Sequence, residues 1–392
     1  MDYPVATSPR VDVAEKTLKN RFDIGRSQGH SMFTKLKSQV IVDRVATTGN
    51  MRFEPATYKS KNPRYFIRGA DKKEHEFTLH NHAFGQMLDC IDVPRHFARK
   101  LGEGDMWERV QLANVLMTER FQLKNFNQRG GGKDRFVNRL VNDQVRGFVS
   151  RSFACYIGSH HVLNPFANNC AKYGALPISA TATDLRFELK MFLPYVFEPV
   201  DGEYMAIGAS ISNSDFGGIA FRISLCIHRI KRGTSAVVED TMSKPHKGKA
   251  LDMTDGILKK DTIEAEITAL QKTIRDIVDV TLHPDAVKRV LKAVQVAADK
   301  EIRWDQLKKQ LGKVLSEHEV KSMENMLQGG ENETFDLPQL SSTADGEPIP
   351  NMFWASSVVA AIAEQELSGE RKLDMQDLAG TLIGVGKHKS AA

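Results

Sequence analysis

Residues 219–228, Ile-Ala-Phe-Arg-Ile-Ser-Leu-Cys-Ile-His, alternate between large apolar side chains and smaller or polar ones. Successive side chains of a β-strand point to opposite faces of the sheet, so a period of two predicts a strand with one buried face. Residues 185–192 and 204–211 alternate in the same way. The three stretches predict an antiparallel or mixed sheet at the centre of the chain.

The segments around this sheet indicate the fold class. Residues 261–327 have apolar side chains spaced by three and four, as in amphipathic helices, whereas the polar N-terminal residues show no clear period. We therefore expect an α+β fold, with a central curved sheet flanked by helices and a helical C-terminal region. The expected divisions are a mobile N-terminal arm (1–37), a basic α/β core (38–258), a helical region (259–327), a linker (328–350), and C-terminal helices with a tail (351–392).

The two parts of the chain differ in charge. The 392 residues include 54 Lys and Arg against 49 Asp and Glu, a formal net charge of +5. Residues 1–250 hold 37 basic and 25 acidic residues, or +12, and residues 251–392 hold the other 17 and 24, or −7. This asymmetry predicts that the front part binds a polyanion. The acidic part is expected to join subunits or to bind a replication or recombination partner.

Several classes of protein are disfavoured by what the sequence lacks. No apolar run approaches the ~20 residues that span a bilayer. The four cysteines include no CxxC pair, which predicts buried thiols rather than a zinc site. Nucleotide-binding and hydrolase motifs such as GxxxxGK[ST], GxGxxG, GxSxG and HExxH are missing. We expect no cofactor, no metal and no enzymatic activity.

Residues 120–151 are the strongest candidate for a binding site. They contain eight basic residues, two acidic ones and four interleaved Phe residues. Proteins hold single-stranded nucleic acid by cations on the phosphates and aromatic faces under the bases. Residues 135–151 predict a β-hairpin around an Asn142-Asp143 turn, in the same sheet as the three alternating strands. The pattern also fits a solvated strand pair whose Phe residues face the core.

The expected contacts fall into three groups. Phosphates are to be bound by Arg129, Lys133, Arg135, Arg139, Arg146 and Arg151, and bases are to stack on Phe136 and Phe148. Arg186, Lys190 and Arg222 extend the surface if their strands join the same sheet. Arg139 and Arg146 each lie three residues from the turn, so we expect them to face one another across the hairpin, with a polyanion between them.

Other interpretations of the sequence remain open. Residues 80–101 have the outline of a helix-turn-helix, which predicts a double-stranded DNA binder that uses Arg95, Arg99 and Lys100. Convergence of Asp184, Asp201 and Asp215 on a metal ion would make a nuclease, although turn chemistry explains Asp201 and Asp215. His75, His80 and His82 with Glu76 lack an evident fourth ligand for a metal. A structural or host-takeover protein with no nucleic-acid role is the last alternative.

Six short motifs follow one another along the chain: Ala83–Met87, Ile91–Pro94, Val145–Phe153, Ile211–Gly217, His228–Gly233 and His246–Lys249. In this order they resemble the phage and plasmid-like family grouped as domain of unknown function 932, over about residues 80–380. The chain departs from that family at Ile230–Gly233 and at Trp354–Val359. The resemblance implies a phage or mobile-element origin. The lack of a membrane-spanning run and of a secretory signal in the first 20 residues predicts a location in the cytoplasm, that of the host if the protein is phage-encoded.

At the level of the fold, the family is similar to phage single-strand annealing proteins of the Red-beta, RecT and Erf kind. This similarity implies a homo-oligomer that binds single-stranded DNA and anneals complementary strands.

Overall fold

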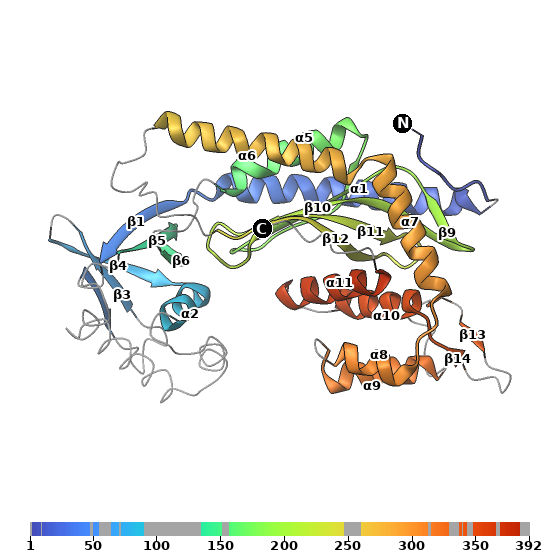
Figure 1. The fold of residues 1–392 in the computed structure, drawn as a ribbon. Helices are drawn as coiled ribbons and strands as arrows, with labels where there is room; N and C mark the ends of the chain where they lie inside the picture. The colour runs from blue at the N-terminus through green and yellow to red at the C-terminus, as the bar shows by residue number, and fades with distance from the viewer. Residues whose placement is uncertain are drawn as a thin grey trace.

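The computed structural model describes residues 2–8, 10–47, 50–54, 64–69, 72–89, 135–150, 157–246, 260–312, 315–328, 337–338, 340–342, 348–365 and 369–384. It confirms an α+β fold with a central sheet and helices at the C-terminal end (Figure 1). The sheet is divided, however, into two separate six-stranded sheets.

The first sheet has the strand order β1-β5-β6-β4-β3-β2. Its strands are β1 (Val42–Thr47), β2 (Met51–Glu54), β3 (Arg64–Arg68), β4 (Glu74–Leu79), β5 (Arg135–Val141) and β6 (Gln144–Ser150). All pairs are antiparallel except β4 with β6, which run parallel. Helix α2 (Asn81–Asp89) packs on one face through Ala83 and Met87, which share a core with Tyr65 and Phe148.

The hairpin of β5 and β6 forms as the sequence predicts. Its turn residues Asn142 and Asp143 have φ angles of 50° and 58°. Two consecutive left-handed residues twist a two-residue turn to match the strands, and Asn and Asp tolerate that conformation well. The expectation that this hairpin shares a sheet with residues 185–192, 204–211 and 219–229 is wrong, because those strands belong to the second sheet.

The second sheet is antiparallel, with the order β12-β11-β10-β8-β7 and with β9 paired to β10. Its strands are β7 (Leu176–Ala182), β8 (Phe187–Phe192), β9 (Phe197–Val200), β10 (Glu203–Asn213), β11 (Phe221–Arg229) and β12 (Thr234–Lys244). Ile207, Ile211, Ile223 and Leu225 alternate as predicted and are fully buried. Helices α5 (Ser159–Lys172), α6 (Lys260–Thr281) and α7 (Pro284–Asp299) share this core.

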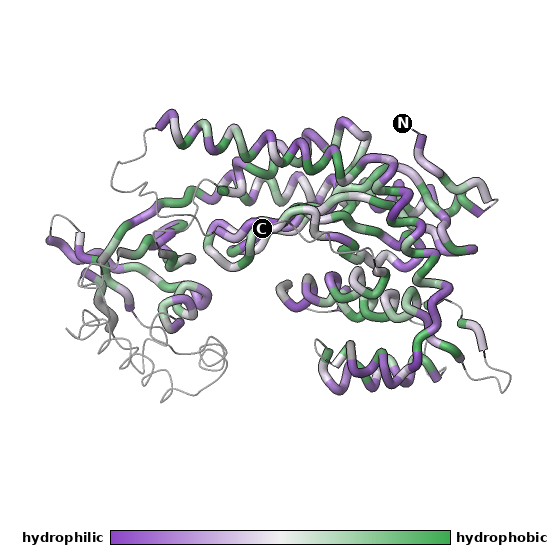
Figure 2. Tube along the Cα trace, viewed as in Figure 1, coloured by the Kyte–Doolittle hydropathy of each residue, from purple (hydrophilic) through white to green (hydrophobic). Residues whose placement is uncertain are grey.

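Residues 11–38 form helix α1 (Val11–Ser38) rather than a mobile arm. Ala14, Leu18, Phe22, Gly25 and Gly29 follow one another at intervals of three and four and are buried. This side of the helix packs with side chains of β7, β8, β10 and β12. Figure 2 shows polar and apolar residues alternating along α6 as well, as expected of helices that cover a sheet on one side.

The C-terminal part is helical. Helices α8 (Trp304–Leu311) and α9 (Glu317–Leu327) follow α7, and the predicted linker includes the short pair β13 (Ser341–Ser342) and β14 (Pro348–Ile349). Helices α10 (Met352–Gln365) and α11 (Gly369–Ile383) pack against each other and against β12. Within the described ranges, no helix is both long and apolar enough to cross a membrane.

Candidate nucleic-acid interface

Arg139 on β5 is buried and bonded within the protein. Its Nε donates to Asp43 Oδ1 over 2.8 Å, and its Nη1 donates to the main-chain oxygen of Asp215 over 2.5 Å. Only 7% of the residue is exposed. A guanidinium in this position joins β1, β5 and the loop after β10. The expectation that Arg139 binds a phosphate is therefore not supported by its surroundings.

Arg146 on β6 is half-buried and also has protein partners. It donates to Gln144 Oε1 over 3.2 Å and to the Asp184 carbonyl over 3.3 Å, and it lies 3.7 Å from Asp184 Oδ1. Lys35 of α1 approaches the same carboxylate at 3.2 Å. Lys35 and then Arg146 hold the pKa of Asp184 below its usual value. Asp184 thus connects α1 with β6.

The expected pairing of Arg139 with Arg146 across the hairpin is wrong. The register places Arg139 opposite Gly147, and the ladder shifts between Arg139 and Leu140. Such a bulge changes which residues face each other. Because the two guanidinium groups have different partners, no polyanion is needed between them.

Phe136 and Phe148 stack on each other rather than standing free. Their ring centroids are 4.4 Å apart with an interplanar angle of 19°, and Phe148 is 3% exposed. Phe148 lies in the core of the first sheet with Met87 and Val145. This is the core arrangement that the sequence left open as an alternative.

The loop at residues 213–218 lies where the two sheets meet. Gln86 of α2 donates to the Phe216 carbonyl over 2.9 Å and accepts from the Phe148 N–H over 2.7 Å. His82 Nε2 donates to the same carbonyl over 3.1 Å. His246 Nε2 donates to Asn213 Oδ1 over 2.8 Å. Four of the six sequence motifs therefore meet here, which their separation in the sequence did not reveal.

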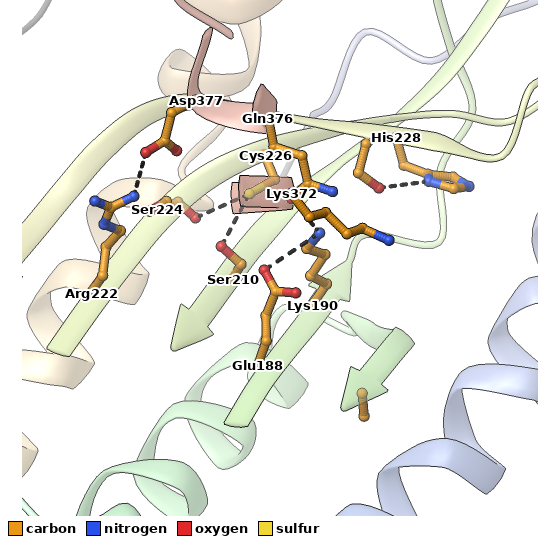
Figure 3. A network of polar contacts seen from close by, with 12 residues as sticks. Glu188, Lys190, Ser210, Arg222, Ser224, Cys226, His228, Lys372, Gln376 and Asp377 are labelled. Carbon is orange, nitrogen blue, oxygen red and sulfur yellow. Dashed lines mark hydrogen bonds and ion pairs between the residues drawn. The ribbon is translucent and has the colours of Figure 1, made fainter. Parts of the chain in front are cut away.

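Two of the three residues expected to extend the surface, Lys190 and Arg222, lie against helix α11 (Figure 3). Lys190 is 3% exposed, donates to Gln376 Oε1 of α11 over 2.9 Å and lies 3.4 Å from Glu188. Arg222 donates to Asp377 Oδ2 over 2.5 Å, and Arg186 is half-buried. Helix α11 covers Lys190 and Arg222 on this face of the second sheet, so the expectation that these two residues line an open basic groove is wrong.

On this covered face, the charged side chains lie next to groups of opposite charge. Burial lowers the pKa of Lys190, but the nearby Glu188, Cys226 and Glu364 raise it above its usual value overall. Gln376 Nε2 and Lys372 Nζ both donate to Glu364, over 3.2 Å and 2.6 Å. His228 is neutral, because burial first, and then Arg21 and Lys190, lower its pKa to about 3.

The alternative sites are only partly covered by the structure. Arg129, Lys133, Arg151, Arg95, Arg99, Lys100 and the side chain of Arg135 lie outside the described residues. Asp215 accepts from the Ser159 N–H at the start of α5, and Glu76 pairs with Arg64. In the described part of the chain, no three His, Cys, Asp or Glu side chains gather as a metal site would require.

Sequence reasoning missed a basic stripe on α1. Its members share one solvent-facing side of the helix, because their spacings of 3, 7, 4 and 7 residues are close to whole turns. The exposed residues of this α1 stripe are Lys16, Lys19, Arg26, His30 and Lys37.

Most cations of the α1 stripe are available to a ligand. Asp23 is the only acidic residue between Lys16 and Lys37. It pairs with Arg26 at 3.0 Å, with both side chains more than half exposed, so the pair is weak. Lys16, Lys19 and Lys37 have no ion-pair partner within the described ranges. The signal in the sequence is the excess of Lys and Arg between the buried positions.

No protein-family model, no curated protein and no solved structure matches the chain. The resemblance to domain of unknown function 932 therefore rests on the motifs alone.

Proposed function

We propose that the chain binds single-stranded nucleic acid and that the α1 stripe forms part of the binding surface. The observation that supports this best is the row of exposed lysines on α1, for which the described residues supply no ion-pair partner. Lys19 and Lys37 are 18 positions apart, about 27 Å along a helix that rises 1.5 Å per residue. The excess of 12 positive charges in residues 1–250 supports the same polyanionic ligand.

A single strand fits this stripe better than a duplex. The cations form one straight row along a helix that lies flat against the second sheet, with its buried side held by β7. One row follows one sugar-phosphate backbone, and proteins that bind single strands without sequence preference track the backbone in this way. Arg129, Lys133, Arg135 and Arg151 remain proposed contacts. We also propose that the chain anneals complementary strands, because of the fold-level similarity to phage single-strand annealing proteins.

Fluorescence anisotropy with a labelled 20-nucleotide single strand, at about 50 and 200 mM salt, tests the proposal. Each phosphate contact contributes about −0.7 to the slope of log affinity against log salt. Lys19→Ala/Lys37→Ala should reduce the magnitude of that slope by about 1.4. The control Lys272→Ala/Lys292→Ala removes the same charge from exposed positions on α6 and α7 and should leave the slope unchanged.

The outcomes separate the candidate functions. Preference for a duplex competitor would favour the helix-turn-helix interpretation of residues 80–101. Absence of binding at low salt would favour a structural or host-takeover role, which the covered face of the second sheet supports. Equal slopes for both double variants would remove α1 from the binding surface.

A further inference from the structure

The edge of the second sheet at β7 is closed by α1. The N–H of Ala180 donates to Gln28 Oε1 over 3.2 Å, and Lys35 Nζ donates to the Ala182 carbonyl over 3.1 Å. Pro177 has no N–H to offer. Side chains of one helix thus satisfy backbone groups of the edge strand, and a further strand is kept away.

Among the residues that the structure describes, none covers the edge of the first sheet at β1 in this way. Of the described strands, β5 alone pairs with β1, on one side. Within the described ranges, the one side-chain hydrogen bond to its backbone comes from Asn138 of that same neighbour, to the Arg44 carbonyl. Val42 is 49% exposed and Val45 is 39% exposed. An edge strand with exposed valines and no proline favours pairing with another strand.

We propose that β1 is the interface of a homodimer, in which two copies of the chain pair antiparallel through this strand. A two-fold axis perpendicular to the sheet makes the edge complementary to itself, since each N–H and C=O meets its counterpart on the partner. The dimer then contains a continuous sheet of twelve strands, six from each copy.

Charge and strand length together select one register for this pairing, because a centre at Val42 or Ala46 would pair no more than three residues of Val42–Thr47 on each copy. With such an axis, the strand pairs about a central residue, so a centre at Asp43 or Arg44 sets two like charges directly opposite each other. A centre at Val45 places Val45 against its own counterpart, Arg44 against Ala46 and Asp43 against Thr47. This register avoids like charges and covers an exposed valine on both copies.

Cross-linking distinguishes this register from other contacts. In a dimer centred on Val45, the two copies of that residue have Cβ atoms about 5 Å apart, whereas the two copies of Val42 are about 20 Å apart along strands that rise ~3.4 Å per residue. A short bis-maleimide should therefore join most of the Val45→Cys variant into dimers. Val42→Cys, which starts from a more exposed residue, should give no more dimer than the wild-type chain with its native thiols.

Sedimentation provides a second, independent measurement. The wild-type chain should sediment with twice the mass of the 43.8 kDa chain, and Val45→Lys should sediment as a monomer with an unchanged circular dichroism spectrum. Val42→Lys should remain dimeric. A monomeric wild-type chain, or cross-linking of Val42→Cys that equals that of Val45→Cys, would overturn the proposal. Neither result depends on nucleic acid, so the proposed binding function stands or falls separately.

Discussion

Protonation of His228 should destabilise the fold as the pH falls below the ordinary range of a histidine. Its ring is 3% exposed on β11, with Nδ1 3.0 Å from Ser235 Oγ and the Phe192 ring edge-on at 5.8 Å. Burial, followed by Arg21 and Lys190, lowers its pKa from 6.5 to about 3. The unfolded chain therefore binds a proton at a pH at which the folded chain does not.

The direction and the size of the change in the free energy of unfolding follow from this difference in pKa. Between pH 6.5 and 3 the unfolded state holds more protons, so the free energy of unfolding decreases as the pH falls. At about pH 4.5, two units below the unfolded pKa, the loss from this one group is about 2.7 kcal/mol at 1.36 kcal/mol per unit. The contribution is fully present above pH 6.5 and is lost toward pH 3.

Urea unfolding of the wild-type chain and of His228→Gln at about pH 7.5 and 4.5 measures this effect. His228→Gln lowers stability at the higher pH, because the ring leaves a packed site, but the further loss on acidification should be ~2–3 kcal/mol smaller than in the wild-type chain. His283→Gln, which changes an exposed histidine at the start of α7, is the control for removing one histidine from the chain. Equal losses on acidification in wild type and His228→Gln would refute the reasoning.

Three further predictions concern packing and the corrected site. Gly25→Ala should lower the thermal midpoint, because its Cβ would lie 2.2 Å from a β7 carbonyl. Gly29→Ala, whose added Cβ would meet no atom within 4 Å, should raise the free energy of unfolding in urea by up to ~1 kcal/mol. Lys190→Met should cost about 3 kcal/mol in the same assay, because it leaves the half-buried Glu188 without its cation; a cost near zero would contradict this ion pair. Arg139→Ala should lower the thermal midpoint and leave the salt slope for single strands unchanged; a reduced slope would return this residue to the binding surface.

Local patterns in the sequence predicted local structure well. The strict alternation in residues 219–228 gave β11, and the Asn142-Asp143 pair gave the turn between β5 and β6. Helix α1 was missed because two of its buried positions, Gly25 and Gly29, have no side chain that marks an apolar stripe. Glycine is read as a helix breaker, but here Gly25 permits close contact with β7.

The choice of partners could not be predicted from alternation. A period of two shows that a strand has two different faces, but not which sheet it joins or what covers each face. Lys190 and Arg222 lie on a polar face that was expected to be free. Their partners Gln376 and Asp377 are 186 and 155 residues away in the sequence, and nothing near the strands indicates them.

During synthesis, α1 is made long before the strands that cover its buried side. The helix leaves the ribosome before the strands that it packs against, because its buried side contacts Ile178, Phe192 and Val237, the last of which is more than 200 residues further along the chain. At roughly 5–20 residues per second, translation takes about 10–40 s to produce these partners. During that interval the nascent helix exposes Leu18 and Phe22 without a surface to cover them. Chaperones should accordingly bind α1 of the nascent chain and leave it once β12 has emerged.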